Sequence, residues 1–308
     1  SPQPWTAEML RDELVSRLRS QAFDVLVIGG GIVGAGLARD AAMRGLRVAL
    51  VEQGDLAGGT SSKTSTLIHG GLRYLEHGHL RLVCESLRER RIVRTIAPQL
   101  VWPLSLSLPV YRGDPRPPWK IGLGLALYGW LAMGFDLRVH RMRSAQAALQ
   151  QEPALNPQAL RAVASYTDCQ MDDARLCLAN VLQAVSFGAV CCNYVKVLAL
   201  EKTSQQICGA MVEETRTAQM FDVHASVVIN ATGPWADSIR RLSDKQASTR
   251  LAPSKGIHLV VRRLVQDGLF VQATQDRRMV FVLPWGDYSL IGTTESTDFH
   301  SLDDLQAE

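Results

Sequence analysis

Three glycines at a defined spacing follow an early apolar run of the chain. Residues 23–28 form that run, and Gly29, Gly31 and Gly34 complete the pattern G-x-G-x-x-G. In a strand–turn–helix unit the first glycine permits a tight turn, and the second lets backbone N–H groups approach a pyrophosphate. The third lets helix and strand pack closely, and the positive end of the helix favours phosphate charge. The spacing therefore predicts a dinucleotide site.

An acidic residue completes this unit. Glu52 stands at the end of the next predicted strand, where its carboxylate can accept hydrogen bonds from ribose hydroxyls. A bare glycine pattern also marks ordinary turns. The order strand, turn, helix, strand and acid is much more specific for dinucleotides.

The composition is that of a folded protein of about two domains. The chain has 308 residues, 46% hydrophobic and 20% charged, and a domain averages roughly 150 residues. A net charge of +3 is too weak to indicate a nucleic-acid partner, and we expect none. No cysteine and histidine set has zinc spacing, so we expect no metal and read the cysteines as buried thiols.

Apolar periodicity predicts the elements that position the glycine unit. We expect helices over residues 5–19, 80–96, 119–135 and 174–187, and strands over 189–200, 207–212, 220–228, 279–283 and 288–292. The very apolar stretch 119–135 is shorter than the roughly 20 residues of a spanning helix. We expect a buried or interfacial helix there, with core contact favoured over membrane contact.

A loop rich in glycine and hydroxyl residues, 58–74, favours a flavin over a nicotinamide cofactor. A nicotinamide-binding fold usually continues with alternating strands and helices after the ribose acid, whereas this loop follows Glu52 almost at once. Its hydroxyl groups can hydrogen-bond a large, tightly held cofactor. The strand end Ala231-Thr232-Gly233 offers another close backbone approach.

Five further segments resemble those of one known family. Together with the glycine unit they extend over nearly the whole chain. They are GTSSKTSTLIHGGLRYLE (59–76), SYTDCQMDDARL (165–176), INATGPWADS (229–238), PSKGIHLVV (253–261) and FVLPWGDYSLIGTTE (281–295). In this order they resemble the FAD-dependent, quinone-linked aerobic glycerol-3-phosphate dehydrogenases.

The resemblance implies an α/β fold with an α+β substrate part. A Rossmann-like FAD-binding domain of the D-amino-acid-oxidase and glutathione-reductase type would be interrupted by a mixed-sheet substrate domain. The expected division is an N-terminal amphipathic helix at 1–20, FAD-binding parts at 21–98 and 166–250, and substrate or cap parts at 99–165 and 251–308.

The same resemblance implies which residues bind FAD. Gly29, Gly31 and Gly34 would hold the pyrophosphate, and Glu52 the adenosine ribose. The other expected contacts are Thr60, Ser61 and Ser62 on the flavin side, His69, Gly70 and Gly71 at the ring, the backbone of Val197 at the adenine, and Ala231, Thr232 and Gly233 closing the site.

Arg73, Tyr74 and His258 match positions near the isoalloxazine and the substrate. Oxidising a secondary alcohol removes a proton from oxygen and a hydride from carbon, so a base is needed. His258 is the preferred base because its reference pKa lies near neutrality, and Arg73 suits a substrate phosphate. In the alternatives, His258 is an ordinary core histidine and Arg73 pairs with Glu76.

The implied reaction is oxidation of sn-glycerol 3-phosphate to dihydroxyacetone phosphate, with electrons passed to a membrane quinone. The protein would be cytoplasmic and peripherally attached to the inner face of the cytoplasmic membrane. Its oligomeric state is left open, with a homodimer as one alternative. The alternatives are a related FAD amino-acid or 2-hydroxy-acid oxidase, a non-catalytic flavin-binding fragment, and, last, a nicotinamide dehydrogenase.

The chain departs from the family pattern at a few positions. Thr66 stands where lysine is frequent, and Glu295 where aspartate is frequent. The sequence ends at Glu308, before an arginine-bearing stretch and a Gly-Gly-Lys-x-Thr-Thr segment that close over flavin and phosphate in the family. Either the chain is a fragment without this C-terminal part, or these functions are missing or supplied otherwise, and the catalytic competence of the chain as given stays open.

Overall fold

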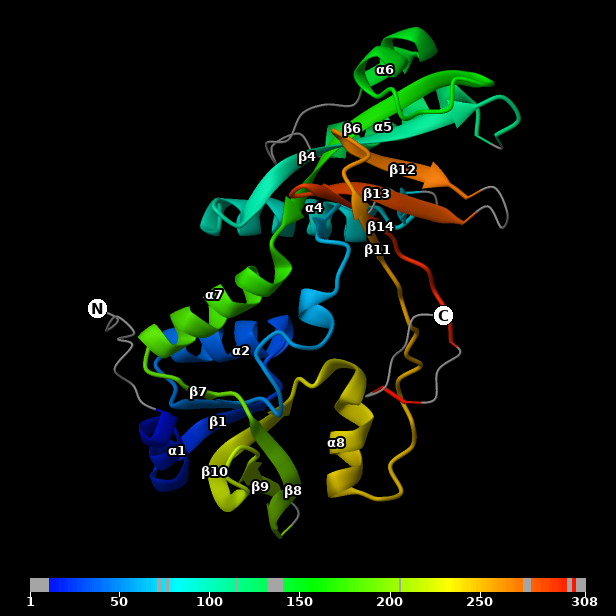
Figure 1. Cartoon of the computed structure of the whole chain (residues 1–308). Helices are drawn as coiled ribbons and strands as arrows, with labels where there is room; N and C mark the ends of the chain where they lie inside the picture. Colours follow the sequence, from blue (N-terminus) through cyan, green and yellow to red (C-terminus); the bar gives the residue numbers. More distant parts are fainter. Residues whose placement is uncertain are drawn as a thin grey trace. The chain divides into compact units, whose positions relative to one another are not determined.

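Two units, each built from separate stretches of the chain, make up the structure. This computed structural model describes residues 11–70, 74–75, 78–114, 116–131, 141–204, 206–273, 278–297 and 301–302. Unit 1 comprises Ser1–Thr64, Asp173–Pro253 and Ser301–Asp304, and unit 2 comprises Ser65–Asp172, Ser254–His300 and Leu305–Glu308. The chain therefore leaves unit 1 after Thr64 and returns to it at Asp173 (Figure 1).

A six-stranded sheet forms the centre of unit 1. Its strands are β1 (Ala22–Ile28), β2 (Val48–Val51), β7 (Val190–Cys192), β8 (Val195–Thr203), β9 (Gln206–Glu214) and β10 (Gln219–Asn230). Their spatial order is β7-β2-β1-β10-β9-β8. The first four strands in this order pair in parallel, and β10, β9 and β8 pair antiparallel. Because parallel strands are covered on both faces, β2 is apolar and buried throughout.

Helices cover both faces of this sheet. On one face, α2 (Ile32–Met43) and α7 (Asp173–Ser186) lie side by side (Figure 1). The small side chains Ala35 and Ala38 let α2 pack closely on β1 and β2. On the other face, α1 (Arg11–Ser20) buries Leu18, and α8 (Ala236–Ser243) contributes Ile239 to the same core cluster.

Unit 2 is built on an eight-stranded mixed sheet. Its strands are β3 (Leu67–Ile68), β4 (Val101–Tyr111), β5 (Arg141–Ser144), β6 (Leu160–Met171), β11 (Leu259–Arg262), β12 (Gly268–Gln272), β13 (Met279–Trp285) and β14 (Tyr288–Gly292). The order is β11-β14-β13-β12-β4-β6-β3, with β5 paired to β6. The long strands β4 and β6 of this sheet pair antiparallel, with Val101 opposite Met171.

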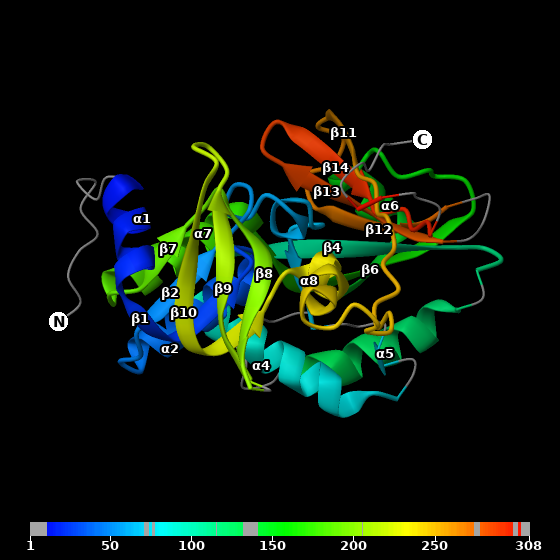
Figure 2. The same cartoon turned by 90° about the horizontal axis from the view of Figure 1, so that it is seen from below.

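Two helices pack against β4 and β6, on the same side of both strands (Figure 2). They are α4 (Leu80–Ile96) and α5 (Pro118–Leu131), and a third helix, α6 (Ala145–Gln151), belongs to a separate cluster. Val83 and Leu87 of α4 share one core cluster with Leu104 and Leu106 of β4. This packing is the reason why α4 belongs to unit 2, whereas the sequence-based division assigns residues 65–98 to the FAD-binding part.

Most predicted elements are confirmed. The helix predicted over 80–96 is α4, the helix over 174–187 is α7, and the strands over 279–283 and 288–292 are β13 and β14. The strand predicted over 189–200 divides into β7 and β8, because Tyr194 has a φ of +52° and turns the chain. The predicted helix 119–135 is α5, and residues 132–135 lie outside the described part.

In the described part of the chain, no helix combines the length and the apolar character needed to cross a lipid bilayer.

Candidate functional site

The β1–α2 turn has a geometry that side chains would block. Gly29 has a φ of +111°, and a Cβ atom there would lie 2.6 Å from the carbonyl oxygen of Ala231. A Cβ atom at Gly34 would lie 1.9 Å from the carbonyl oxygen of Gly29. The Gly29 N–H donates to the Val51 carbonyl at 2.8 Å, which joins the turn to β2. Glycine is therefore required at both positions by close backbone approach.

The first turn of α2 presents backbone N–H groups at its positive end. Gly31 is the N-cap residue, and it has no side chain to accept hydrogen bonds from this turn. The Ile32 N–H donates to the Ser61 hydroxyl oxygen at 2.9 Å. N–H groups and the helix dipole together make such a terminus suitable for a pyrophosphate. Ser61 is thus placed beside the glycine turn, within unit 1.

Glu52 is held by the loops around it. Its Oε2 atom accepts from the Gly30 N–H at 2.7 Å, and its Oε1 atom accepts from the Gly54 N–H at 2.8 Å. Each carboxylate oxygen has two lone-pair sites, so one remains on each for a ribose hydroxyl. The two backbone bonds fix the direction of the carboxylate at the end of β2.

The end of β10 is shaped by a residue that the sequence reasoning missed. The Asn230 Oδ1 atom accepts from the Thr232 hydroxyl at 2.7 Å and from the Thr232 N–H at 3.3 Å. Its Nδ2 atom donates to the Ala236 carbonyl at 2.8 Å. The Ala231 N–H donates to the Ile28 carbonyl at 2.8 Å, which brings this strand end beside the glycine turn. An asparagine just before a Thr-Gly turn is the signal that could have revealed it.

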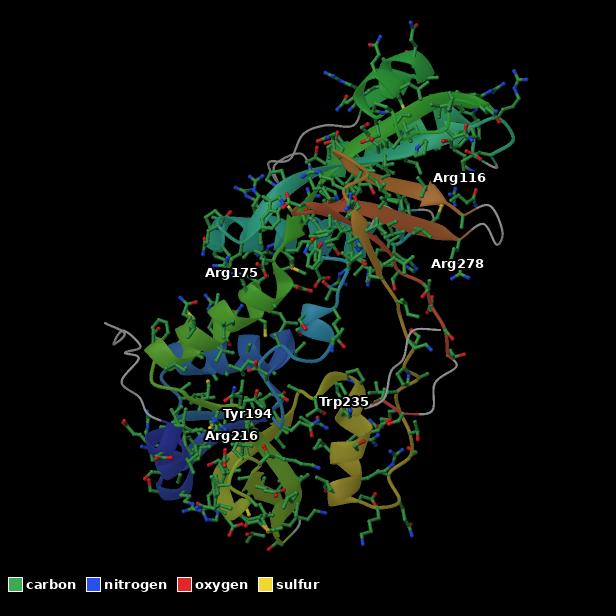
Figure 3. The ribbon with its side chains drawn as sticks, in the orientation of Figure 1. Arg116, Arg175, Tyr194, Arg216, Trp235 and Arg278 are labelled. Atoms are coloured by element: carbon green, nitrogen blue, oxygen red, sulfur yellow. The ribbon has the colours of Figure 1, made fainter. Side chains whose placement is uncertain are left out.

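Thr60, Ser62 and Val197 lie elsewhere in unit 1. Thr60 and Ser62 form the ends of the short helix η1 (Thr60–Ser62). Gly59, just before it, lies close to the Trp235 ring, since a Cβ atom there would be 3.3 Å from Cζ3; Figure 3 labels this tryptophan near the start of α8. Val197 is buried in β8, at an irregularity in the pairing with β9.

The predicted base belongs to a hydrogen-bonded pair in unit 2. The His258 Nε2 atom and the Ser65 hydroxyl oxygen are 2.9 Å apart. The imidazole also contacts the end of β14, because a Cβ atom at Gly292 would lie 2.6 Å from His258 Cδ2. The Thr294 N–H donates to the Ile257 carbonyl at 3.2 Å and so joins the two stretches. The histidine is therefore a positioned side chain.

The structure describes some of the residues that were predicted to contact the flavin ring and the substrate. His69 is exposed, Gly70 is buried, and Tyr74 is 40% exposed. Gly71 and Arg73 lie outside the described residues. The Gly70 N–H donates to the Asp168 Oδ1 atom at 3.3 Å, and the sequence reasoning did not single out Asp168.

Asp168 and Arg90 form a buried ion pair in unit 2, each with 1% of its side chain exposed. The Tyr128 hydroxyl donates to the same Asp168 Oδ1 atom at 2.9 Å. Burial raises the pKa of Asp168, and the Arg90 guanidinium, the Tyr128 hydroxyl, His69 and the Gly70 N–H oppose this rise by stabilising the carboxylate. Arg90, Tyr128 and the Gly70 N–H thus all donate hydrogen bonds to one buried carboxylate oxygen.

The chain is similar to glycerol-3-phosphate dehydrogenases in sequence and in structure. It is 40% identical over 300 residues to the mitochondrial enzyme of Homo sapiens, covering 92% of this chain and 41% of that protein. It is 40% identical over 304 residues to the enzyme of Synechocystis sp., covering 94% of this chain and 55% of that protein. The solved structure of the glycerol-3-phosphate dehydrogenase from Bacillus halodurans, complexed with FAD, matches with a TM-score of 0.79 at 30% identity, covering 96% of this chain and 52% of that chain.

The chain thus spans about half the length of these relatives. A model of the DAO family, described as FAD dependent oxidoreductase, matches residues 24–308, which include both units. The glycine turn, the acid after β2 and the strand end at Ala231 all fall within this match. The chain belongs to the DAO family of FAD dependent oxidoreductases and has its fold.

Proposed function

We propose that this chain is part of a FAD-dependent dehydrogenase that oxidises sn-glycerol 3-phosphate to dihydroxyacetone phosphate. The substrate is suggested by the relatives that are named glycerol-3-phosphate dehydrogenase. The structural observation that carries the chemistry is the hydrogen-bonded pair of His258 and Ser65. A dehydrogenase of an alcohol needs a fixed proton acceptor, and this imidazole is held in one orientation.

Unit 1 offers a fitting cradle for the adenosine and pyrophosphate parts of FAD. The α2 N-terminus, next to Gly31, would hold the pyrophosphate through backbone N–H groups. Glu52 would accept hydrogen bonds from the ribose, and Val197 would meet the adenine through its backbone. Thr60, Ser61, Ser62, Ala231, Thr232 and Gly233 would complete the unit 1 contacts. His69, Gly70 and Gly71 would contact the flavin ring.

The protein residues handle the proton while FAD, when bound, supplies a hydride acceptor at N5. His258 takes the proton from the substrate hydroxyl as the C–H bond gives up its hydride and the C–O bond becomes a carbonyl. Ser65 keeps the ring in place by its bond to Nε2. Arg73 binds the substrate phosphate as a bidentate donor, and Tyr74 lies beside it in the chain.

A membrane quinone is the proposed electron acceptor, and α5 is the proposed contact with the membrane. Trp119, Leu123, Leu127 and Trp130 lie on one side of α5 and are 71, 66, 40 and 62% exposed. Arg116, labelled in Figure 3, and Lys120 are exposed and lie next to the start of this helix in the sequence. Exposed tryptophans flanked by basic residues suit an anionic headgroup layer. The protein would then sit at the inner face of the cytoplasmic membrane, and we propose a homodimer there.

The test is anaerobic reduction of the FAD-loaded chain. Addition of glycerol 3-phosphate should bleach the flavin absorbance, and addition of glycine or lactate should leave it unchanged. Bleaching by glycine or lactate alone would point to an oxidase of the related class. Bound flavin that none of the three bleaches would assign this chain a flavin-binding role without catalysis, and a chain that takes up no FAD would refute the proposal.

A further inference from the structure

A buried polar cluster in unit 2 holds the backbone at Gly70 from several elements at once. The Asp168 Oδ1 atom, on β6, accepts from Arg90 of α4, from the Tyr128 hydroxyl of α5 at 2.9 Å, and from the Gly70 N–H at 3.3 Å. Among the hydrogen bonds of the described residues, Gly70 is the backbone donor to this carboxylate.

Stability alone does not account for this cluster. Taking an ion pair out of water costs free energy, and apolar side chains of similar volume often stabilise a core at least as well. The Arg90 Nε and Nη2 atoms are buried and find no hydrogen-bond partner among the described residues. Arg90 therefore has incomplete hydrogen bonding in the core, and its remaining nitrogen, Nη1, is bound to Asp168.

The packing around Gly70 leaves no room for a side chain on the side that faces Tyr128 and Leu87. A Cβ atom at this residue would lie 2.2 Å from the Tyr128 hydroxyl oxygen and 2.5 Å from Leu87 Cδ2. Gly70 thus sits directly on α4 and α5, at the point where their side chains reach the Asp168 carboxylate. The His69 side chain, one residue earlier, is exposed. The cluster therefore determines where the 69–70 peptide presents its polar groups.

We infer that Asp168 is a positioning residue for the flavin, which acts by fixing the Gly70 backbone, with Arg90 and Tyr128 holding its carboxylate. This inference rests on the proposed function, because that proposal assigns the 69–70 peptide to the flavin ring. A peptide group beside the ring contributes to FAD affinity and, through its dipole, to the reduction potential. Displacing Gly70 should change both quantities.

Variants at two members of the cluster, with a matched control, test this role. Asp168→Asn removes the charge that faces Arg90, and Tyr128→Phe removes one donor while the ion pair stays. Ser165→Ala is the control, because Ser165 is buried on the same strand and pairs with Ser107 at 3.0 Å without contacting Gly70. The full chain is used, and circular dichroism with thermal unfolding shows which variants are folded.

Two readouts separate positioning from a general loss of stability. Hydrogen exchange of a peptide containing Gly70, measured without FAD and well below the unfolding temperature, should be at least about tenfold faster in Asp168→Asn and several-fold faster in Tyr128→Phe. The Kd for FAD should rise about tenfold and several-fold in the same order, with a shifted flavin reduction potential. Ser165→Ala should match the wild type in each.

The outcomes separate this inference from the proposed reaction. If the wild type binds FAD and glycerol 3-phosphate leaves it oxidised, the proposed reaction fails while the exchange, affinity and potential data still decide on Asp168. If Tyr128→Phe is folded and exchange at Gly70, the Kd for FAD and the potential all stay at wild-type values, the positioning role is refuted. A wild-type chain without FAD affinity refutes both.

Discussion

The His258 Nε2 atom and the Ser65 hydroxyl oxygen are 2.9 Å apart, although 193 positions separate the residues in the sequence. Ser65 precedes β3, and His258 precedes β11, so two distant stretches of unit 2 meet at this hydrogen bond. A bond to one ring nitrogen fixes the rotation of an imidazole and leaves the other nitrogen with a defined direction. The imidazole is therefore held in place by a residue from a distant stretch of the chain.

Replacing His258 by asparagine should slow flavin reduction by glycerol 3-phosphate about 10²- to 10⁴-fold, the usual contribution of a general base. FAD affinity should change little, because the proposed adenosine and pyrophosphate contacts lie in unit 1. Anaerobic stopped-flow bleaching measures the rate. The control is His224→Asn, since His224 is exposed on β10 and pairs with Glu201. Wild-type reduction rates in His258→Asn would remove this residue from the mechanism.

Two glycines on α2 offer a matched pair of substitutions. Gly34→Ala places a Cβ atom 1.9 Å from the Gly29 carbonyl oxygen, whereas Gly36→Ala meets nothing within 4 Å. Gly34→Ala should destabilise the fold by about 1–3 kcal/mol or more and weaken FAD binding. Gly36→Ala should stabilise it by about 0.5–1 kcal/mol, as alanine does inside a helix. Urea unfolding and FAD titration check both, and equal behaviour of the two variants would contradict the assigned turn geometry.

Asp237 should make the free energy of unfolding of unit 1 depend on pH in the acidic range. The N–H groups of Leu251 and Arg250, and then the Arg240 guanidinium, lower the pKa of Asp237 from 3.8 to about 2. Because the pKa of Asp237 is lower in the folded than in the unfolded state, its carboxylate stabilises the folded state at pH values above the unfolded pKa of 3.8. This stability is lost as the pH falls from there towards 2. The urea midpoint of Asp237→Asn should therefore lie below that of the wild type at pH 6, and the gap should narrow over this acid range; a constant gap would disprove the linkage.

The exposed side of α5 should bind anionic vesicles. The double variant Trp119→Ser/Trp130→Ser removes two tryptophans that are 71 and 62% exposed, and co-sedimentation with phosphatidylglycerol vesicles should fall about tenfold or more. Added salt should weaken wild-type binding, because Arg116 and Lys120 flank the patch. Trp285→Ser, at a tryptophan that is 48% exposed on β13, is the control. If this control loses as much binding, α5 is not the contact.

Local signals in the sequence predicted the unit 1 turn well. Gly29, Gly34 and Glu52 can be recognised because a strand, a turn and a helix follow one another within a short stretch, and each position has one physical task. The helix over 80–96 was predicted at its true bounds for the same reason, since its apolar spacing is local. Its assignment to unit 2 depends on Leu104 and Leu106, which sequence spacing does not connect to it.

Buried polar partners could not be predicted in this way. Arg90 and Asp168 meet across 78 positions, and each reads in the sequence as an ordinary charged residue that could face solvent. The roles of Asn230 and Ser65 likewise arise from hydrogen bonds that form after the chain has folded back on itself. The periodicity of apolar residues shows which face of an element is apolar. It does not show which polar side chain of a distant element will lie against that element in the core.

The position of β10 in the sheet has a consequence for how the chain is made. Ile28 of β1 pairs with Asn230 of β10, so the apolar first strand emerges from the ribosome long before its central neighbour is synthesised. Contacts of such large sequence separation form slowly, and unpaired strand edges invite aggregation in the meantime. During synthesis, the edge of β1 that pairs with β10 therefore stays unpaired while residues 65–172 of unit 2 are translated.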